Sequence, residues 1–128
     1  MTKPVGDRVI YPELSFQLME IAFEIHNQLG PGFGEEIYQK AFEHELALRS
    51  VPFERQETIQ VVYKGQLVGT YRLDLVVDNK IIVELKAVAG LNDLFKQQLR
   101  SYLKATGLRL GILINFGAAR VQSGRIAN

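Results

Sequence analysis

Apolar residues recur every three or four positions in three segments of the chain, and this spacing predicts three amphipathic helices. The helices are expected over residues 13–29, 35–49 and 92–106. Gly30 and Gly107 follow the first and the third of them, where glycine commonly ends a helix. The chain therefore begins with two helices and carries a third in its second half.

The segments between the helices are rich in β-branched residues that alternate with polar ones. This pattern predicts strands over 53–63, 67–77 and 80–88, joined by short turns into an antiparallel meander. The near-continuous apolar run over 108–115 follows a helix, so we expect a strand covered on both faces and parallel to a neighbour. The order α-α-β-β-β-α-β describes an α/β domain with a mixed central sheet flanked by helices.

The two ends of the chain show little periodicity. Residues 1–8 and 118–128 are expected to be flexible ends of a single domain that spans residues 1–128. For the second of these segments, a short edge strand and a nucleic-acid-facing arm are the alternatives.

Charged residues interrupt the apolar hairpin formed by the second and third strands. If residues 78–80 form a three-residue loop, counting outward places Asp74 directly across from Glu84, and Lys86 shares their face. Cross-strand carboxylates about 5 Å apart repel unless a positive charge lies between them. Lys86 is one candidate for that charge. A divalent cation is the stronger one, since carboxylates suit Mg²⁺ or Mn²⁺. A two-residue loop would place the two acids on opposite faces.

Composition excludes several classes of site. The absence of cysteine rules out a disulfide framework, a thiolate zinc site and a cysteine nucleophile. The net charge of +1 is low for a non-specific nucleic-acid binder, so any contact with DNA must come from a local patch. Neither a membrane span of about 20 apolar residues nor a secretion signal is visible, and a cytoplasmic location with no membrane partner is expected.

Two motifs point to a known family. Asp74 followed at hairpin spacing by Glu84-Leu85-Lys86 resembles the active-site signature of the PD-(D/E)XK nuclease superfamily. Gly32-Phe-Gly-Glu35-Glu-Ile-Tyr38 resembles the pattern that names a bacterial branch of it, the GxxExxY proteins. The resemblance runs from about residue 8 to residue 117 and implies a restriction-endonuclease-like fold.

The resemblance implies metal-dependent hydrolysis of phosphodiester bonds in nucleic acid, with DNA as the expected substrate. Asp74, Glu84 and the backbone carbonyl of Leu85 would hold Mg²⁺ or Mn²⁺, and Glu35 would join them directly or through water. Lys86 would orient or deprotonate the attacking water, or stabilise the transition state.

A third motif lies in the last helix. Gln98-x-x-x-Tyr102 resembles an element of the branch that includes RecB-type nucleases and lambda exonuclease, where the pair positions the site or the DNA backbone. Members of the family often carry a histidine three residues before this glutamine, and Phe95 occupies that place here. If that histidine takes part in the chemistry, this chain is impaired there.

Two further residues have both a structural and a functional interpretation. His26 either binds a backbone carbonyl near the core or faces the cation or substrate. Tyr38 either packs in the core with a buried partner for its hydroxyl or contacts the substrate.

Three functions are consistent with these residues. The first is a metal-dependent nuclease. The second is a catalytically inactive nucleic-acid-binding or assembly module on the same fold. The third is a small homodimer whose acidic cluster is structural. A chain of this size is expected to span a duplex only as a homodimer or beside an accessory protein.

Overall fold

The computed structural model describes residues 10–128, so the predicted flexible segment at residues 1–8 lies outside the described part of the chain. Three helices are present: α1 (Pro12–Leu29), α2 (Glu35–Leu48) and α3 (Asp93–Thr106). The strands are β1 (Phe53–Arg55), β2 (Thr58–Tyr63), β3 (Gln66–Arg72), β4 (Leu75–Val77), β5 (Ile81–Lys86), β6 (Leu110–Asn115) and β7 (Gln122–Ala127).

Local sequence signals set the helix ends. Pro12 occupies the first turn of α1, where its missing N–H costs no hydrogen bond. The side chain of Asn92 caps α3 by accepting a hydrogen bond from the backbone N–H of Phe95 at 3.3 Å. Gly107 ends α3 in the left-handed conformation, with φ of 75°. The three predicted helices are confirmed to within one or two residues.

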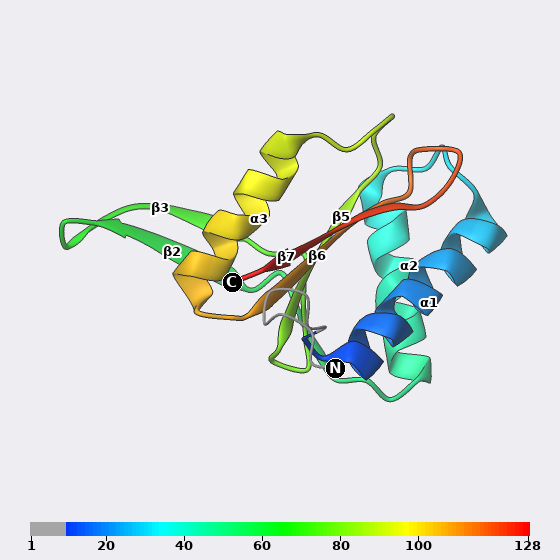
Figure 1. Ribbon diagram of the computed structural model, residues 1–128, viewed down its shortest axis with the longest axis horizontal. Coiled ribbons are helices and arrows are strands. Elements are labelled where there is room, and N and C mark those ends of the chain that lie inside the picture. Colours follow the sequence, from blue (N-terminus) through cyan, green and yellow to red (C-terminus); the bar gives the residue numbers. More distant parts are fainter. Residues whose placement is uncertain (1–9) are drawn as a thin grey trace, which may run out of the picture.

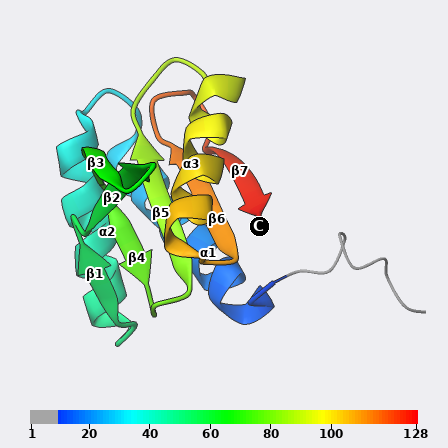
Figure 2. The ribbon, with the colours of Figure 1, turned by 90° about the vertical axis from the view of Figure 1, so that its left-hand side faces the viewer.

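Five strands form one mixed sheet in the order β1-β4-β5-β6-β7. Strands β5 and β6 are parallel, and the other neighbours are antiparallel. Helices α1 and α2 cover one face of the sheet and α3 covers the other (Figures 1 and 2). The predicted mixed sheet flanked by helices and the parallel placement of the strand after α3 are both confirmed.

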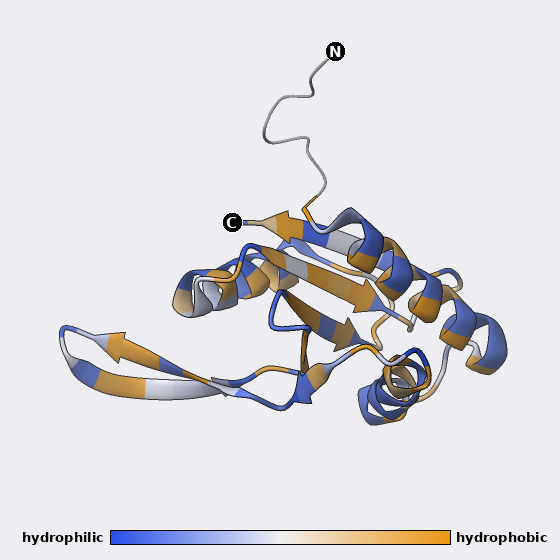
Figure 3. Ribbon diagram, turned by 90° about the horizontal axis from the view of Figure 1, so that it is seen from below, coloured by the Kyte–Doolittle hydropathy of each residue, from blue (hydrophilic) through white to orange (hydrophobic). Residues whose placement is uncertain are grey.

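The predicted strands 53–63 and 67–77 are each divided in two. The first part of the earlier segment, β1, and the last part of the later one, β4, join the main sheet. Between them in the chain, β2 and β3 form a separate two-stranded hairpin that projects from the body (Figures 1 and 3). The break falls at Gln56, whose φ of 52° is left-handed. Backbone hydrogen bonds from Gln56 N to Asp74 O and from Leu73 N to Glu57 O carry the pairing across this break. The two chain segments therefore turn away from the main sheet together.

The prediction of a flexible end over 118–128 is wrong, because residues 122–127 form the edge strand β7 beside β6. The guanidinium of Arg125 donates to Ser15 Oγ at 2.9 Å and to the carbonyl oxygen of Ile10 at 2.7 Å. These bonds tie the edge strand to the start of α1. Only Ile126 of this strand is buried, so apolar periodicity does not reveal it.

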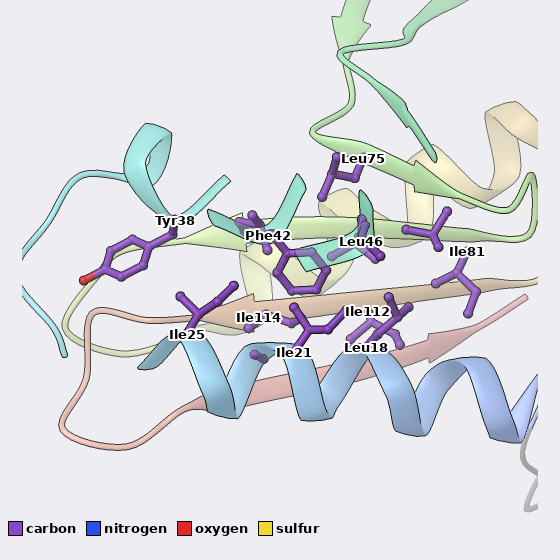
Figure 4. Close-up of a cluster of buried hydrophobic side chains, with 14 of the residues drawn as sticks. Leu18, Ile21, Ile25, Tyr38, Phe42, Leu46, Leu75, Ile81, Ile112 and Ile114 are labelled. Atoms are coloured by element: carbon purple, nitrogen blue, oxygen red, sulfur yellow. The ribbon is translucent and has the colours of Figure 1, made fainter. Parts of the chain in front are cut away.

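Two apolar clusters lie on opposite faces of the sheet. The larger packs α1 and α2 against Leu75, Ile81, Ile112 and Ile114, with Phe42 at its centre (Figure 4). The smaller packs α3 against the other face, and its members are Ile59, Leu73, Val76, Ile82, Leu99, Tyr102, Leu103, Leu113 and Ile126. Successive strand residues alternate between these clusters, as the pleat requires.

Among the described residues, none of the helices combines the length and the apolar character that a membrane crossing needs.

Candidate active site

The turn between β4 and β5 has the predicted length. Val77 pairs with Ile81 and Leu75 pairs with Val83, so residues 78–80 form a three-residue loop. Asp74, one residue before β4, lies next to Glu84. The backbone N–H of Asp74 donates to Glu84 Oε1 at 3.2 Å. The two predicted carboxylates are therefore neighbours, as the hairpin register requires.

A second hydrogen bond joins Asp74 to β5, and in this one the side chain of Asp74 is the acceptor. Asp74 Oδ2 accepts a hydrogen bond from the backbone N–H of Leu85 at 2.8 Å. The side chain of Leu85 itself is buried against the α1–α2 face. Its neighbours along the strand, Glu84 and Lys86, therefore point to the α3 face. The signature places its charged residues on one side of the sheet and its apolar residue on the other.

Lys86 ends β5 beside α3. Its Nζ lies 4.9 Å from the centre of the Phe95 ring, which is within the range of a cation–π contact. The ring of Phe95 therefore holds the ammonium group near the carboxylates. Phe95 occupies the place at which the resemblance implies a histidine, so an apolar ring supports the lysine where a titratable one was expected.

Burial disfavours the form of the site in which both carboxyl groups are charged. Glu84 is only 7% exposed, and burial, followed by the nearby charge of Asp74, raises its pKa to about 8. Burial also raises the pKa of Asp74, against the opposing effects of the Leu85 N–H and the Lys86 charge. At neutral pH and without a cation, the raised pKa of Glu84 therefore favours its protonated form beside Asp74.

Glu35 is the first residue of α2. Burial raises the pKa of its carboxyl group, Lys86 lowers it and Asp74 raises it, so Glu35 lies within electrostatic reach of both. The structure does not bring Glu35 into one cluster with the hairpin acids. In the described part of the chain, no three Asp, Glu or His side chains are grouped as ligands of one metal ion.

Tyr38 explains the local geometry of the Gly-x-x-Glu-x-x-Tyr motif. Its hydroxyl donates to the carbonyl oxygen of Gly30 at 2.6 Å and accepts from the backbone N–H of Phe33 at 3.2 Å. Its ring stacks on Phe116 with centroids 4.6 Å apart. Gly32 lies inside the loop that these bonds close, with φ of 118°, which favours glycine. Of the two interpretations of Tyr38, the structure therefore supports the one in which it packs in the core with a partner for its hydroxyl. The same hydroxyl fixes the loop that leads into Glu35.

Gln98 and Tyr102 lie one turn apart on α3. Burial raises the pKa of Tyr102 to about 12, with further contributions from Glu84, Tyr71 and Asp74, so this hydroxyl lies within electrostatic reach of the carboxylates. Tyr102 is 7% exposed, whereas Gln98 is half-buried beside it in a surface groove. The structure thus places Tyr102 within electrostatic reach of the acids and Gln98 one helical turn away in the same groove.

His26 contacts a different part of the molecule from the site residues described above. Its Nε2 is 3.0 Å from the carbonyl oxygen of Ala118, in the loop between β6 and β7. This contact corresponds to the structural interpretation of His26, in which the ring binds a backbone carbonyl.

Asn115 is a residue of the site region that the sequence interpretation missed. It pairs with Lys86 across the parallel strands and is fully buried. Its Oδ1 accepts from the backbone N–H groups of Val88 and Gly117, and its Nδ2 donates to the carbonyl of Val88 and to Gln122 Oε1. Asn115 therefore fixes the segment that follows Lys86. In the sequence, the indication of this role was a single amide side chain at the end of an apolar run.

The donor set fits a hard divalent cation. Burial raises the pKa values of Glu84 and of the half-buried Asp74, the charge of Asp74 adds to the shift of Glu84, and a cation would favour the charged forms of both. Asp74, Glu84 and the carbonyl of Leu85 are the groups that would hold it, with Glu35 within electrostatic reach.

The chain belongs to the PD-(D/E)XK nuclease superfamily, whose family model matches residues 12–126. A solved structure described as "Crystal structure of SSO0001" has a similar fold, with a TM-score of 0.57 and 20% sequence identity. The match covers 92% of this chain and 57% of that one, so this chain spans little more than half of the other protein. Among curated proteins, none matches the chain.

Proposed function

We propose that this chain is a metal-dependent nuclease that hydrolyses phosphodiester bonds in nucleic acid, with DNA as its substrate. The observation that carries the proposal is the pair of hydrogen bonds that joins Asp74 to the Glu84-Leu85 segment, with Lys86 two residues further along β5, in a chain of a nuclease superfamily. The glycine, glutamate and tyrosine of the 32–38 motif further favour the GxxExxY branch.

In this proposal, one group of residues binds the metal ion and a second group acts on the water and the substrate. Asp74, Glu84 and the Leu85 carbonyl would hold the Mg²⁺ or Mn²⁺ ion, and Glu35 would join them directly or through water. When bound, the cation supplies positive charge against the scissile phosphate and activates a water nucleophile.

Lys86 orients the attacking water and neutralises charge that builds up on the phosphate oxygens. The Phe95 ring restricts where its ammonium group lies. Gln98 and Tyr102 position the substrate beside the carboxylates. None of these assignments requires a group from outside the chain other than the cation.

A second function has a specific observation in its favour. Phe95 stands where the resemblance implies a histidine, and Glu35 does not complete a three-acid cluster. A nucleic-acid-binding or assembly module that retains the fold without the activity would carry such changes.

The test is cleavage of linear, nicked and branched DNA, with RNA in parallel, in the presence of Mg²⁺ or Mn²⁺. Asp74→Asn should abolish cutting. Asp78→Asn is the matched control, because Asp78 lies on the same hairpin and its φ of 53° suits asparagine. Cutting by wild type and Asp78→Asn alone supports the nuclease. Binding without cutting in all three supports the second function.

A further inference from the structure

A groove runs between the projecting β2–β3 hairpin and α3, with a volume of about 490 Å³. We call it the hairpin groove. It is lined by Ile59, Val61, Tyr71, Leu94, Gln97, Gln98, Ser101, Tyr102 and Ala105. No charged side chain is among these residues. The lining offers two aromatic rings, aliphatic surface, two amides and three hydroxyl groups.

Two residues of the candidate active site, Gln98 and Tyr102, belong to the lining of the groove. Tyr102 and Ile59 are the buried members of the lining, and the charge of Glu84 contributes to the raised pKa of Tyr102. Across the groove, the ring of Tyr71 lies 5.2 Å from the ring of Tyr102 at an angle of 55°. Tyr71 is 49% exposed, so much of its ring is free for a ligand. An occupant of the groove would therefore rest on Tyr71 and lie beside Gln98 and Tyr102.

A row of positive charge follows the same helix. Lys96, Arg100 and Lys104 recur at every fourth position and are all exposed, which places them along one side of α3. Each directly precedes a groove residue and so lies about 100° around the helix from it. Within residues 10–128, none of the three forms an ion pair with an acid. This basic row therefore lies on the side of α3 next to the groove-lining side, with the stem of Lys96 close to Gly124 of β7.

We propose that the hairpin groove binds an unpaired nucleic-acid strand, with bases stacked on Tyr71 and phosphates along Lys96, Arg100 and Lys104. This inference rests on the proposed function and names its substrate class. Stacking on an aromatic side chain needs a base whose face is free, and a cationic row tracks the backbone of a single strand. A duplex hides its base faces in the stack and presents phosphates, for which the groove itself has no cation. The strand to be cut is thus unpaired where it crosses the site.

The first experiment measures binding without cleavage. Fluorescence anisotropy in EDTA compares a labelled single strand of mixed sequence with a blunt duplex of the same length. The single strand should bind at least about tenfold more tightly. Tyr71→Ala should remove about tenfold or more of that affinity, the scale expected for loss of one stacked base. Tyr71→Phe should keep it.

Tyr63→Ala is the matched control, because Tyr63 lies on the same hairpin, is 63% exposed and does not line the groove. It should bind the single strand as the wild type does. Thermal melting of each variant identifies loss of fold. A triple Lys96→Gln, Arg100→Gln, Lys104→Gln variant should bind more weakly and flatten the logarithmic salt dependence by about 2, since a single strand contributes about 0.7 per phosphate contact.

Several results would overturn the proposal. Equal affinity for duplex and single strand, or an equal loss in Tyr63→Ala and Tyr71→Ala, excludes the groove as the single-strand site. A dimer in light scattering that Tyr71→Ala dissociates shows that a second copy of the chain covers the groove instead. Cleavage in Mg²⁺ is measured separately on the same two DNAs. Faster cutting of the duplex overturns this inference and leaves the nuclease intact, whereas binding without cutting overturns the nuclease alone.

Discussion

Asp74 and Glu84 hold each other across the start of the β4–β5 hairpin. The backbone N–H of Asp74 donates to Glu84 Oε1, while Asp74 Oδ2 accepts from the N–H of the residue that follows Glu84. Each carboxyl group is thus fixed by the opposite backbone segment, which leaves little freedom to relieve repulsion by moving apart. Burial raises the pKa values of both carboxyl groups, and the charge of Asp74 raises that of Glu84 further.

Glu84→Gln should change how stability depends on pH. The Glu84 carboxyl group titrates near 4.5 when unfolded, and its pKa is raised to about 8 in the folded protein. Between these values the folded state binds more protons, so the free energy of unfolding falls as pH rises through this window. Glutamine removes this titration. The variant should lose less stability between about pH 5 and pH 9, by a few kcal/mol at about 1.4 kcal/mol per pKa unit.

Urea unfolding at several pH values measures this difference. Glu36→Gln is the control, because Glu36 is exposed and pairs only with Lys40 at the surface. Parallel pH profiles for wild type and Glu84→Gln would show that Glu84 does not hold a proton in the folded state.

Binding of Mg²⁺ or Mn²⁺ should strengthen as pH rises, because the ion must displace the proton that the raised pKa of Glu84 favours. The melting temperature should therefore increase more on addition of Mn²⁺ at about pH 8 than at about pH 6. At a hundred times the Kd, the added stability is about 2.7 kcal/mol. Scanning fluorimetry measures the shift. The same shift in Asp74→Asn would place the metal elsewhere.

Tyr38→Phe should loosen the loop before α2 while leaving the core intact. The substitution keeps the ring stacked on Phe116 and removes the hydroxyl that joins Gly30 O to Phe33 N. Two lost hydrogen bonds, with their partners partly buried, should cost about 1–3 kcal/mol. Activity should fall further than stability, because this loop positions Glu35.

Urea unfolding and the cleavage rate together test the role of Tyr38. Tyr63→Phe serves as control, since its hydroxyl is on the exposed hairpin. Unchanged stability and activity in Tyr38→Phe would show that the ring alone accounts for the motif.

Asn115→Leu should be the most destabilising of these substitutions. It leaves three backbone groups of Val88 and Gly117 without their side-chain partner in a fully buried position. At about 1–3 kcal/mol for each unsatisfied group, the loss should reach about 3 kcal/mol or more. Denaturant unfolding measures it, with Asn27→Leu at an exposed position of α1 as control. A loss below about 1 kcal/mol would show that water replaces the amide.

The sequence predicted the central hairpin in detail because strand parity is rigid. A loop of three residues leaves only one alignment of Asp74 with Glu84, and Lys86 must then share the face of Glu84. The three helices were equally accessible, since glycine and proline mark their limits.

Other features depend on tertiary contacts that periodicity does not encode. The projection of β2 and β3 follows from the left-handed backbone at Gln56, which an ordinary polar residue adopts without a sequence signal. The edge strand β7 depends on pairing with β6 and on the long reach of Arg125 to Ile10. The role of Phe95 as a support for Lys86 required the position of α3 above the sheet.

The central claim is that Asp74, Glu84 and Lys86 form one hydrolytic centre, and the cleavage rate of Lys86→Met in saturating Mg²⁺ tests it most directly. Methionine keeps the apolar stem against Phe95 and removes only the ammonium group. With the fold and metal binding retained, single-turnover cleavage should fall by at least about a hundredfold, the scale of a lost proton-transfer or charge-stabilising group. Cleavage at the wild-type rate would contradict the assignment of this site as the catalytic centre.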